Sequence, residues 1–133
     1  MTSVNYRNKT KILGHKQFNV LTPYYEFKFK YKNIYYKNIF DAWNNTHELS
    51  KNVKTLIEII LTRYNCDSQF LKALLDTTND MLYISHDDSF EAFYCLVLMF
   101  IRDKSLYKYN LNHLICLEQS FNQYLKSLAI NES

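Results

Sequence analysis

Glycine and proline are almost absent from this chain of 133 residues, which holds one of each, Gly14 and Pro23. Phosphate-binding loops, dinucleotide fingerprints and the nucleophile elbow of hydrolases each need several glycines, so these motifs are excluded. Mirror-image hairpin turns favour residues that tolerate a positive φ, so we expect this chain to avoid them. All-β sandwiches and barrels need many turns and are therefore disfavoured.

The chain also lacks a long apolar segment and a set of closely spaced cysteines. Its longest apolar run covers residues 93–101, far short of the roughly 20 residues of a membrane helix, so we expect a buried helix and no membrane partner. Cys66, Cys95 and Cys116 are too scattered for a disulfide framework or a metal site. We expect Cys95 and Cys116 to be buried in helices, a cytoplasmic location, and neither a cofactor nor a metal.

Lysine, asparagine and tyrosine are abundant, whereas arginine and glycine are scarce. These preferences follow AT-rich codons, so the composition predicts an AT-rich genome such as that of a virus, a phage or a low-GC bacterium. The net charge is +3, and within residues 1–37 eight basic residues face one acidic residue, Glu26. A basic stretch interleaved with tyrosines is typical of a surface that binds nucleic acid. It is equally typical of the solvated face of a strand.

Periodicity predicts a short hairpin followed by helices. Residues 1–17 show no period and are predicted to form a basic N-terminal arm. Residues 25–32 alternate between apolar and polar, which predicts a half-buried strand, with a turn at Lys32-Asn33 and a return strand over 34–36. A third short strand is predicted at 81–84.

Helical spacing then governs most of the remaining chain. Ile39, Trp43 and Leu49 would share one side of a helix over 37–49. Ser50 and Asp67 are predicted to cap the next two helices. Asp88 and Glu91 are spaced as a capping box before the helix that begins at residue 90. The sequence thus predicts an α+β fold, a mainly helical single domain over residues 18–133, in which residues 105–133 add a C-terminal helix.

Four segments, taken in order, resemble motifs of the NADAR N-glycosidase family. Residues 18–27 (FNVLTPYYEF) look like its opening block LSNFYPSPFEF, and residues 31–43 stand where the family has a strand, a turn and a helix with a polar stripe. Residues 70–78 (FLKALLDTT) and 82–90 (LYISHDDSF) are similar to its later blocks LrxaLLaTg and LvExsxxDxfWG. The resemblance implies a NADAR-like domain.

Members of that family cleave N-glycosidic bonds in ribosylated intermediates and are linked to ADP-ribose and NAD metabolism. Their pocket uses a helix glutamate, a lysine about two turns later, and an Asp-x-aromatic-Trp-Gly turn followed by a glycine-rich loop. In this chain Asn38 stands at the glutamate position and Asn45 at the lysine position. Asp88 and Phe90 match the turn, but the Trp-Gly pair and the glycine-rich loop are missing.

These losses predict binding without catalysis. Cleavage of an N-glycosidic bond builds positive charge on the sugar, which a carboxylate must stabilise, and Asn38 cannot ionise. We therefore expect a catalytically degenerate NADAR-like binding protein. It would act as a viral or phage counter-defence factor that sequesters an adenine- or ADP-ribose-containing nucleotide or blocks a host protein. The predicted ligand-binding residues are Tyr36, Asn38, Asp41, Asn45, His86, Asp88 and Phe90.

Several alternatives remain open at this stage. An active N-glycosidase would use relocated carboxylates, namely Asp41, Glu48 and Asp88. Two of these, Asp41 and Glu48, belong to a polar stripe at helical spacing, formed by Asn38, Asp41, Asn45 and Glu48. That stripe is otherwise the solvated face of an amphipathic helix. The segment containing His86 is otherwise an exposed turn with a helix cap. The tyrosine-lysine strand would instead serve as an interaction edge, and the C-terminal helix would form a homodimer.

Overall fold

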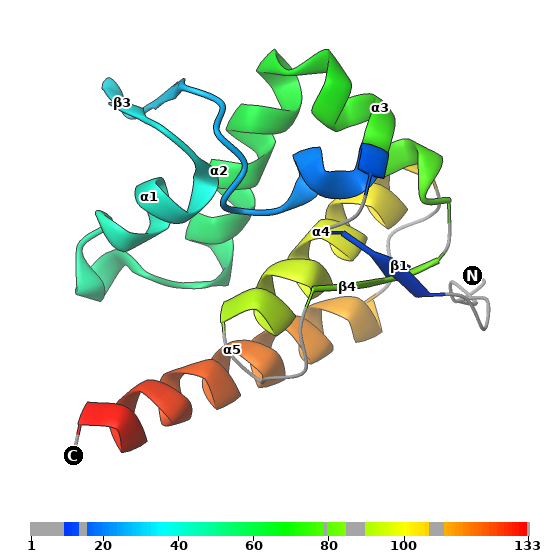
Figure 1. Ribbon diagram of the computed structural model, residues 1–133. Helices are drawn as coiled ribbons and strands as arrows, with labels where there is room; N and C mark the ends of the chain where they lie inside the picture. The colour runs from blue at the N-terminus through cyan, green and yellow to red at the C-terminus, as the bar shows by residue number, and fades with distance from the viewer. Residues whose placement is uncertain (1–9, 14–15, 79, 85–89, 107–110, 133) are drawn as a thin grey trace.

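The computed structural model describes residues 10–13, 16–78, 80–84, 90–106 and 111–132, and its chain is mostly helical (Figure 1). The described α-helices are α1 (Ile39–Asn44), α2 (Val53–Cys66), α3 (Ser68–Asp76), α4 (Phe90–Leu106) and α5 (Leu111–Glu132). The described 3₁₀ helices are η1 (Lys16–Leu21) and η2 (Glu48–Ser50). The described strands are β1 (Thr10–Ile12), β2 (Phe29–Tyr31), β3 (Ile34–Tyr36) and β4 (Met81–Tyr83). The prediction of a mainly helical chain with a small antiparallel hairpin is confirmed at this level.

β2 and β3 form the predicted hairpin, with Lys30 directly opposite Tyr35. The two turn residues, Lys32 and Asn33, have φ values of 49° and 69°. Positive φ at both central residues is the combination that a mirror-image type I′ turn requires. The expectation that this chain avoids such turns is therefore wrong here. Asparagine tolerates the left-handed region better than most residues do, which eases the strain at Asn33.

A second, parallel pair joins β1 to β4, with Lys11 beside Leu82. The strand predicted at residues 81–84 is thus confirmed as β4. β1 lies within the predicted N-terminal arm, and the next residue, Leu13, is fully buried and donates its backbone N–H to the carbonyl of Tyr83 at 2.9 Å. The last part of the arm is therefore integrated into the domain.

Two helix boundaries differ from the prediction. α1 ends at Asn44, and Leu49 lies in η2 with its side chain 90% exposed, so it does not share a buried face with Ile39. The cap of α2 is Asn52, whose Oδ1 accepts the backbone N–H of Thr55 at 2.8 Å, and not Ser50. Asp67 caps α3 as predicted. The predicted capping box at residues 88–91 begins outside the described residues.

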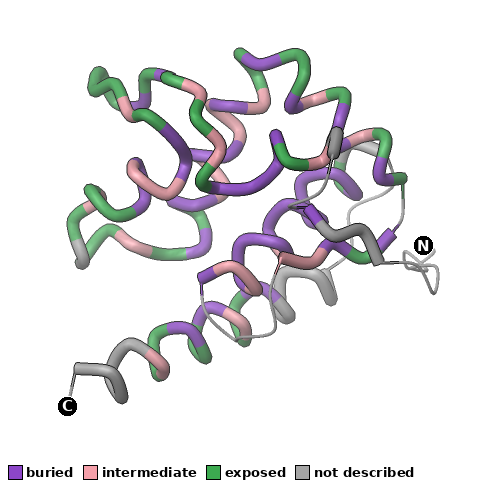
Figure 2. The backbone as a smooth tube through the Cα atoms, in the orientation of Figure 1, coloured by how far each residue is buried: buried purple, intermediate pink, exposed green. Residues whose placement is uncertain are grey.

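The core is built around the single tryptophan, Trp43 of α1. Its ring lies 5.8 Å from Phe90 and 6.1 Å from Phe93 of α4, and 6.4 Å from Phe121 of α5. Its indole N–H donates to the hydroxyl of Tyr124, also on α5, at 3.3 Å. Figure 2 shows buried positions concentrated along α4, which lies between α5 and the rest of the domain. The C-terminal helix therefore completes the core.

A buried arginine ties η1 to the α2–α3 junction. Arg63 is fully buried, and its Nε donates to the Asp67 carboxylate at 2.9 Å while Nη2 donates to the Val20 carbonyl at 3.3 Å. Its guanidinium lies 4.6 Å from the ring of Phe27 and 4.8 Å from that of Phe70. Stacking of a guanidinium on aromatic rings offsets part of the cost of burying its charge.

Across the described helices, none has the length and apolar character needed to cross a membrane.

Candidate functional site

Three of the four residues in the predicted polar stripe, Asn38, Asp41 and Asn45, form hydrogen bonds with one another in and beside α1. Asn38 caps α1, because its Oδ1 accepts the backbone N–H of Asp41 at 2.6 Å. Asp41 in turn accepts the backbone N–H of Lys37 through Oδ2 at 3.2 Å. Asn45 donates its Nδ2 to Asp41 Oδ1 at 3.0 Å. The structure therefore brings Asn38, Asp41 and Asn45 together, with their polar atoms engaged in capping α1.

This arrangement limits what Asp41 can do chemically. Each of its carboxylate oxygens already accepts one hydrogen bond, Oδ2 from the backbone N–H of Lys37 before α1 and Oδ1 from the side-chain amide of Asn45 at the C-terminus of α1. Glu48 does not extend the stripe, because α1 ends at Asn44 and Glu48 begins the separate helix η2. The helical spacing that placed Asp41 and Glu48 on one face is thus interrupted between them.

Of the three predicted ligand-binding residues at positions 86–90, only Phe90 lies within the described part of the chain. Phe90, the first residue of α4, is buried with its ring 5.4 Å from Phe40 and 5.8 Å from Trp43. The Phe90 ring therefore packs within the aromatic core around Trp43. His86 and Asp88 lie outside the described residues.

A cavity of about 540 Å³ lies between the hairpin and α1, and we call it the hairpin cavity. It contains two predicted residues, Tyr36 and Asp41. Its lining consists of aromatic, basic and acidic side chains: Glu26, Phe27, Lys28, Tyr35, Tyr36, Lys37 and Asp41. The ammonium group of Lys28 lies 5.1 Å from the centre of the Tyr35 ring. The hairpin cavity thus combines three aromatic rings with charges of both signs.

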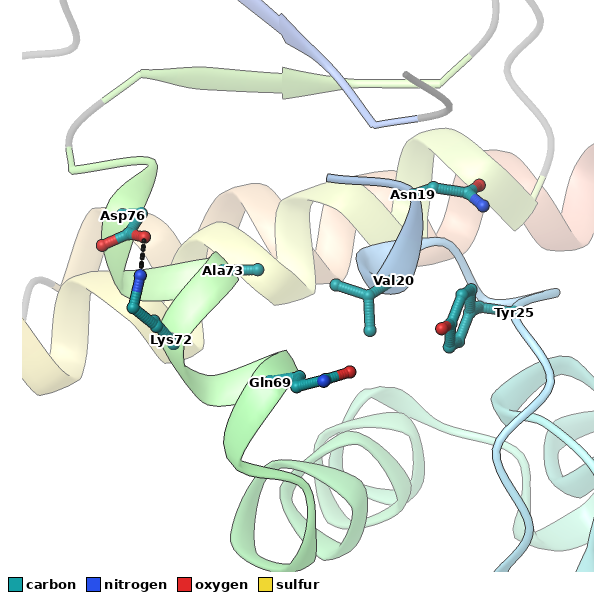
Figure 3. Close-up of a pocket in the computed structure, with 7 residues that line it drawn as sticks. All are labelled: Asn19, Val20, Tyr25, Gln69, Lys72, Ala73 and Asp76. Atoms are coloured by element: carbon teal, nitrogen blue, oxygen red, sulfur yellow. Dashed lines mark hydrogen bonds and ion pairs between the residues drawn. The ribbon is translucent and has the colours of Figure 1, made fainter. Parts of the chain in front are cut away.

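A second cavity, of about 590 Å³, lies between η1 and α3 (Figure 3). Val20, Ala73 and Gln69 point toward its space and Tyr25 faces them across it, whereas Lys72 and Asp76 pair with each other to one side. The Lys72–Asp76 distance is 3.2 Å and both side chains are exposed. Sequence reasoning missed this site, because Gln69 and Ala73 read as ordinary positions of an amphipathic helix.

Neither cysteine whose side chain the structure describes, Cys66 or Cys95, is an activated nucleophile. Cys95 is buried as predicted, and that burial raises the pKa of its thiol to about 12, so the thiolate is not populated near neutral pH. Burial also raises the pKa of Cys66, although this residue is exposed. No group of three or more metal-binding side chains occurs in the described part of the chain.

The chain was compared with models of protein families, with curated proteins and with solved structures. No match was found in any of the three. The NADAR resemblance therefore rests on the four sequence segments alone, and any function must be argued from the cavities and surfaces of this chain.

Proposed function

We propose that this protein binds a nucleotide of the ADP-ribose type in the hairpin cavity and does not turn it over. The observation that carries the proposal is the presence of Tyr36 and Asp41 in one cavity with two lysines, Lys28 and Lys37. Tyr36 and Asp41 belong to the segment that resembles the NADAR family. Under this proposal the scaffold is NADAR-like and lacks the family's helix glutamate and lysine, at whose positions Asn38 and Asn45 stand.

Each part of such a ligand has a matching group in the cavity. The ammonium groups of Lys28 and Lys37 would pair with phosphate oxygens. The rings of Tyr35 and Tyr36 would pack against the base, since aromatic faces stack on heterocycles. Ribose hydroxyls would donate to a carboxylate such as that of Glu26. The cavity volume of about 540 Å³ lies within the usual range of small-molecule sites, roughly 300–1,000 Å³.

The hydrogen bonds that Asp41 accepts favour binding over catalysis. A glycosidase carboxylate must face the sugar carbon on which positive charge develops. Both oxygens of Asp41 instead accept hydrogen bonds from groups at the ends of α1, and Asn38 carries no charge. An active N-glycosidase using Asp41, Glu48 and Asp88 is therefore the weaker alternative. A binder without turnover suits sequestration of a nucleotide signal, which would be useful to a virus or phage.

Calorimetric titration with ADP-ribose, ADP and adenosine tests the proposal. We expect ADP-ribose to bind more tightly than adenosine, because only the former engages the lysines. Replacing Lys37→Gln should weaken ADP-ribose binding about tenfold, the usual cost of losing a charge-assisted hydrogen bond. Lys54→Gln, an exposed lysine of α2, is the matched control and should leave the affinity unchanged. Absence of heat with all three compounds would contradict the proposal.

A second measurement separates binding from catalysis. ADP-ribose and NAD are incubated with the protein and the products are separated by chromatography. We expect no released base. Release of base that disappears in Asp41→Asn would replace the binding proposal with the N-glycosidase alternative.

A further inference from the structure

The hairpin has two unlike faces. Phe29 and Tyr31 of β2 are buried, and β2 packs against α2. The opposite face carries Lys28 and Lys30 with Tyr35 between them, since Lys30 and Tyr35 are directly opposed. The ammonium groups of Lys28 and Lys30 lie 5.1 and 5.7 Å from the centre of the Tyr35 ring. We call this surface the lysine face.

No ion pair within the described residues neutralises the lysines in and beside the hairpin. Lys28, Lys30, Lys32 and Lys37 are all exposed, and none of their ammonium groups forms an ion pair with another described residue. Glu26 is the one acidic residue within 26–37. Asp41 of α1 lines the hairpin cavity together with Glu26, Lys28 and Lys37, so the four lysines outnumber these two acids. This excess of cations raises the local positive potential and attracts polyanions.

We infer that the lysine face binds single-stranded nucleic acid. The charge is complementary to a phosphate backbone, and lysines two residues apart on a strand lie about 6.8 Å apart. That spacing resembles the separation of neighbouring phosphates in an extended single strand.

The exposed aromatic ring decides between a nucleic acid and an acidic protein. Tyr35 is 61% exposed and its neighbour Ile34 is 55% exposed. Every base offers a π-face, so aromatic side chains beside cations bind single strands without sequence preference. A duplex keeps its bases stacked inside, which leaves Tyr35 no base to stack on. An acidic polypeptide would form ion pairs with the lysines, but its carboxylates would not stack on the Tyr35 ring.

This surface goes beyond the hairpin cavity and is tested separately. Lys28 and Tyr35 belong to both the lysine face and the lining of that cavity, whereas Lys30, Lys32 and Ile34 do not line it. The binding assay contains no mononucleotide, so its result does not depend on the calorimetric one. Either proposal can fail while the other stands.

Fluorescence anisotropy with labelled twelve-nucleotide dT and U oligomers measures the interaction between 50 and 200 mM salt. Each phosphate contact to a single strand contributes about 0.7 to the salt slope. Three lysine contacts therefore predict a slope of about −2, which is about a 16-fold loss of affinity over this fourfold range of salt.

Two variants of the lysine face sharpen the test. Lys30→Glu should weaken binding about tenfold and reduce the slope by at least 0.7 or so. Tyr35→Leu should weaken binding at least fivefold or so and leave the slope unchanged, because stacking involves no counterion. Lys54→Glu makes the same change of net charge at an exposed position of α2 that belongs to neither the hairpin nor the hairpin cavity, and it should keep the affinity within about twofold.

Four results would overturn the inference. The first is no binding at 50 mM salt. The second is equal affinity for a duplex of the same length, and the third is equal affinity for poly-glutamate, which would indicate an acidic protein partner. The fourth is an equal loss in Lys54→Glu and Lys30→Glu, which would indicate attraction to net charge without a defined surface. Circular dichroism of each variant verifies that its fold is retained.

Discussion

At the scale of single residues, Asn38 matters both for the stability of α1 and for the proposed absence of catalysis. The family resemblance places it where a catalytic glutamate is expected, and the structure places it at the N-terminus of α1. Its side chain is buried, with Oδ1 bonded to the Asp41 backbone and Nδ2 at 3.5 Å from the Tyr24 carbonyl. An N-cap needs an acceptor, and asparagine supplies one without burying a charge.

We predict that Asn38→Ala lowers the free energy of unfolding by about 1–2 kcal/mol, the cost of losing an N-cap. Asn38→Ser keeps an acceptor and should recover most of that loss. Asn44→Ala, at the exposed end of the same helix, is the control and should change stability little. Urea denaturation followed by the fluorescence of Trp43 measures all three. Equal stability of Asn38→Ala and the wild type would show that the cap contributes nothing.

At the scale of elements, the end of α1 depends on side chains near its C-terminus. Apolar spacing suggests a helix to Leu49, but the helix ends at Asn44. Asn45 donates its amide to the Asp41 carbonyl at 2.8 Å, and Thr46 donates its hydroxyl to the Ala42 carbonyl at 2.9 Å. Such local bonds compete with the backbone bonds that would continue a helix. Periodicity alone does not contain this information.

The hairpin turn provides a prediction at the same scale. Lys32 and Asn33 both have a positive φ, which costs a lysine about 1–2 kcal/mol. Changing the pair to Asn-Gly, the preferred type I′ sequence, should raise the free energy of unfolding by about 1 kcal/mol. Thermal and urea denaturation measure the change.

Glycine is not stabilising in general, so a control is needed for that variant. Asn122→Gly, at an exposed position within α5, should lower stability by a few tenths of a kcal/mol or so. A loss of stability in the Asn-Gly variant would mean that the turn has a different conformation in solution.

At the scale of the whole molecule, three distant helices meet at Trp43. Phe121 of α5 is buried, with its ring 6.4 Å from Trp43 of α1 and 5.2 Å from Phe93 of α4. The apolar residues of α5 that are described as buried, Leu117, Phe121 and Tyr124, are thus covered inside one chain. These contacts explain how the described part of α5 buries Phe121 and Tyr124 against α1 and α4.

We predict that Phe121→Ala lowers the free energy of unfolding by about 3–5 kcal/mol, through lost burial and the cavity left behind. Leu125→Ala on the same helix is the control, because Leu125 is 43% exposed and such a change should cost less than about 1 kcal/mol. Urea denaturation monitored at Trp43 reports both. Equal effects of the two substitutions would indicate that α5 does not dock on the core in solution.

Local patterns in the sequence determined much of the architecture. The period of two predicted the buried face of β2, the Lys-Asn pair predicted the turn, and Asp67 predicted a helix start, because each depends on neighbours within a few residues. The polar stripe likewise predicted that Asn38, Asp41 and Asn45 lie together.

Only the tertiary structure decided which of these residues line a cavity and which are structural. Tyr36 and Asp41 share a cavity because the hairpin folds beside α1. Phe90 instead packs on Trp43 in the core. The second cavity joins η1 to α3, two segments about fifty residues apart in the chain. Contacts between segments so far apart depend on how whole helices pack, and helix packing has no signature in a local run of residues.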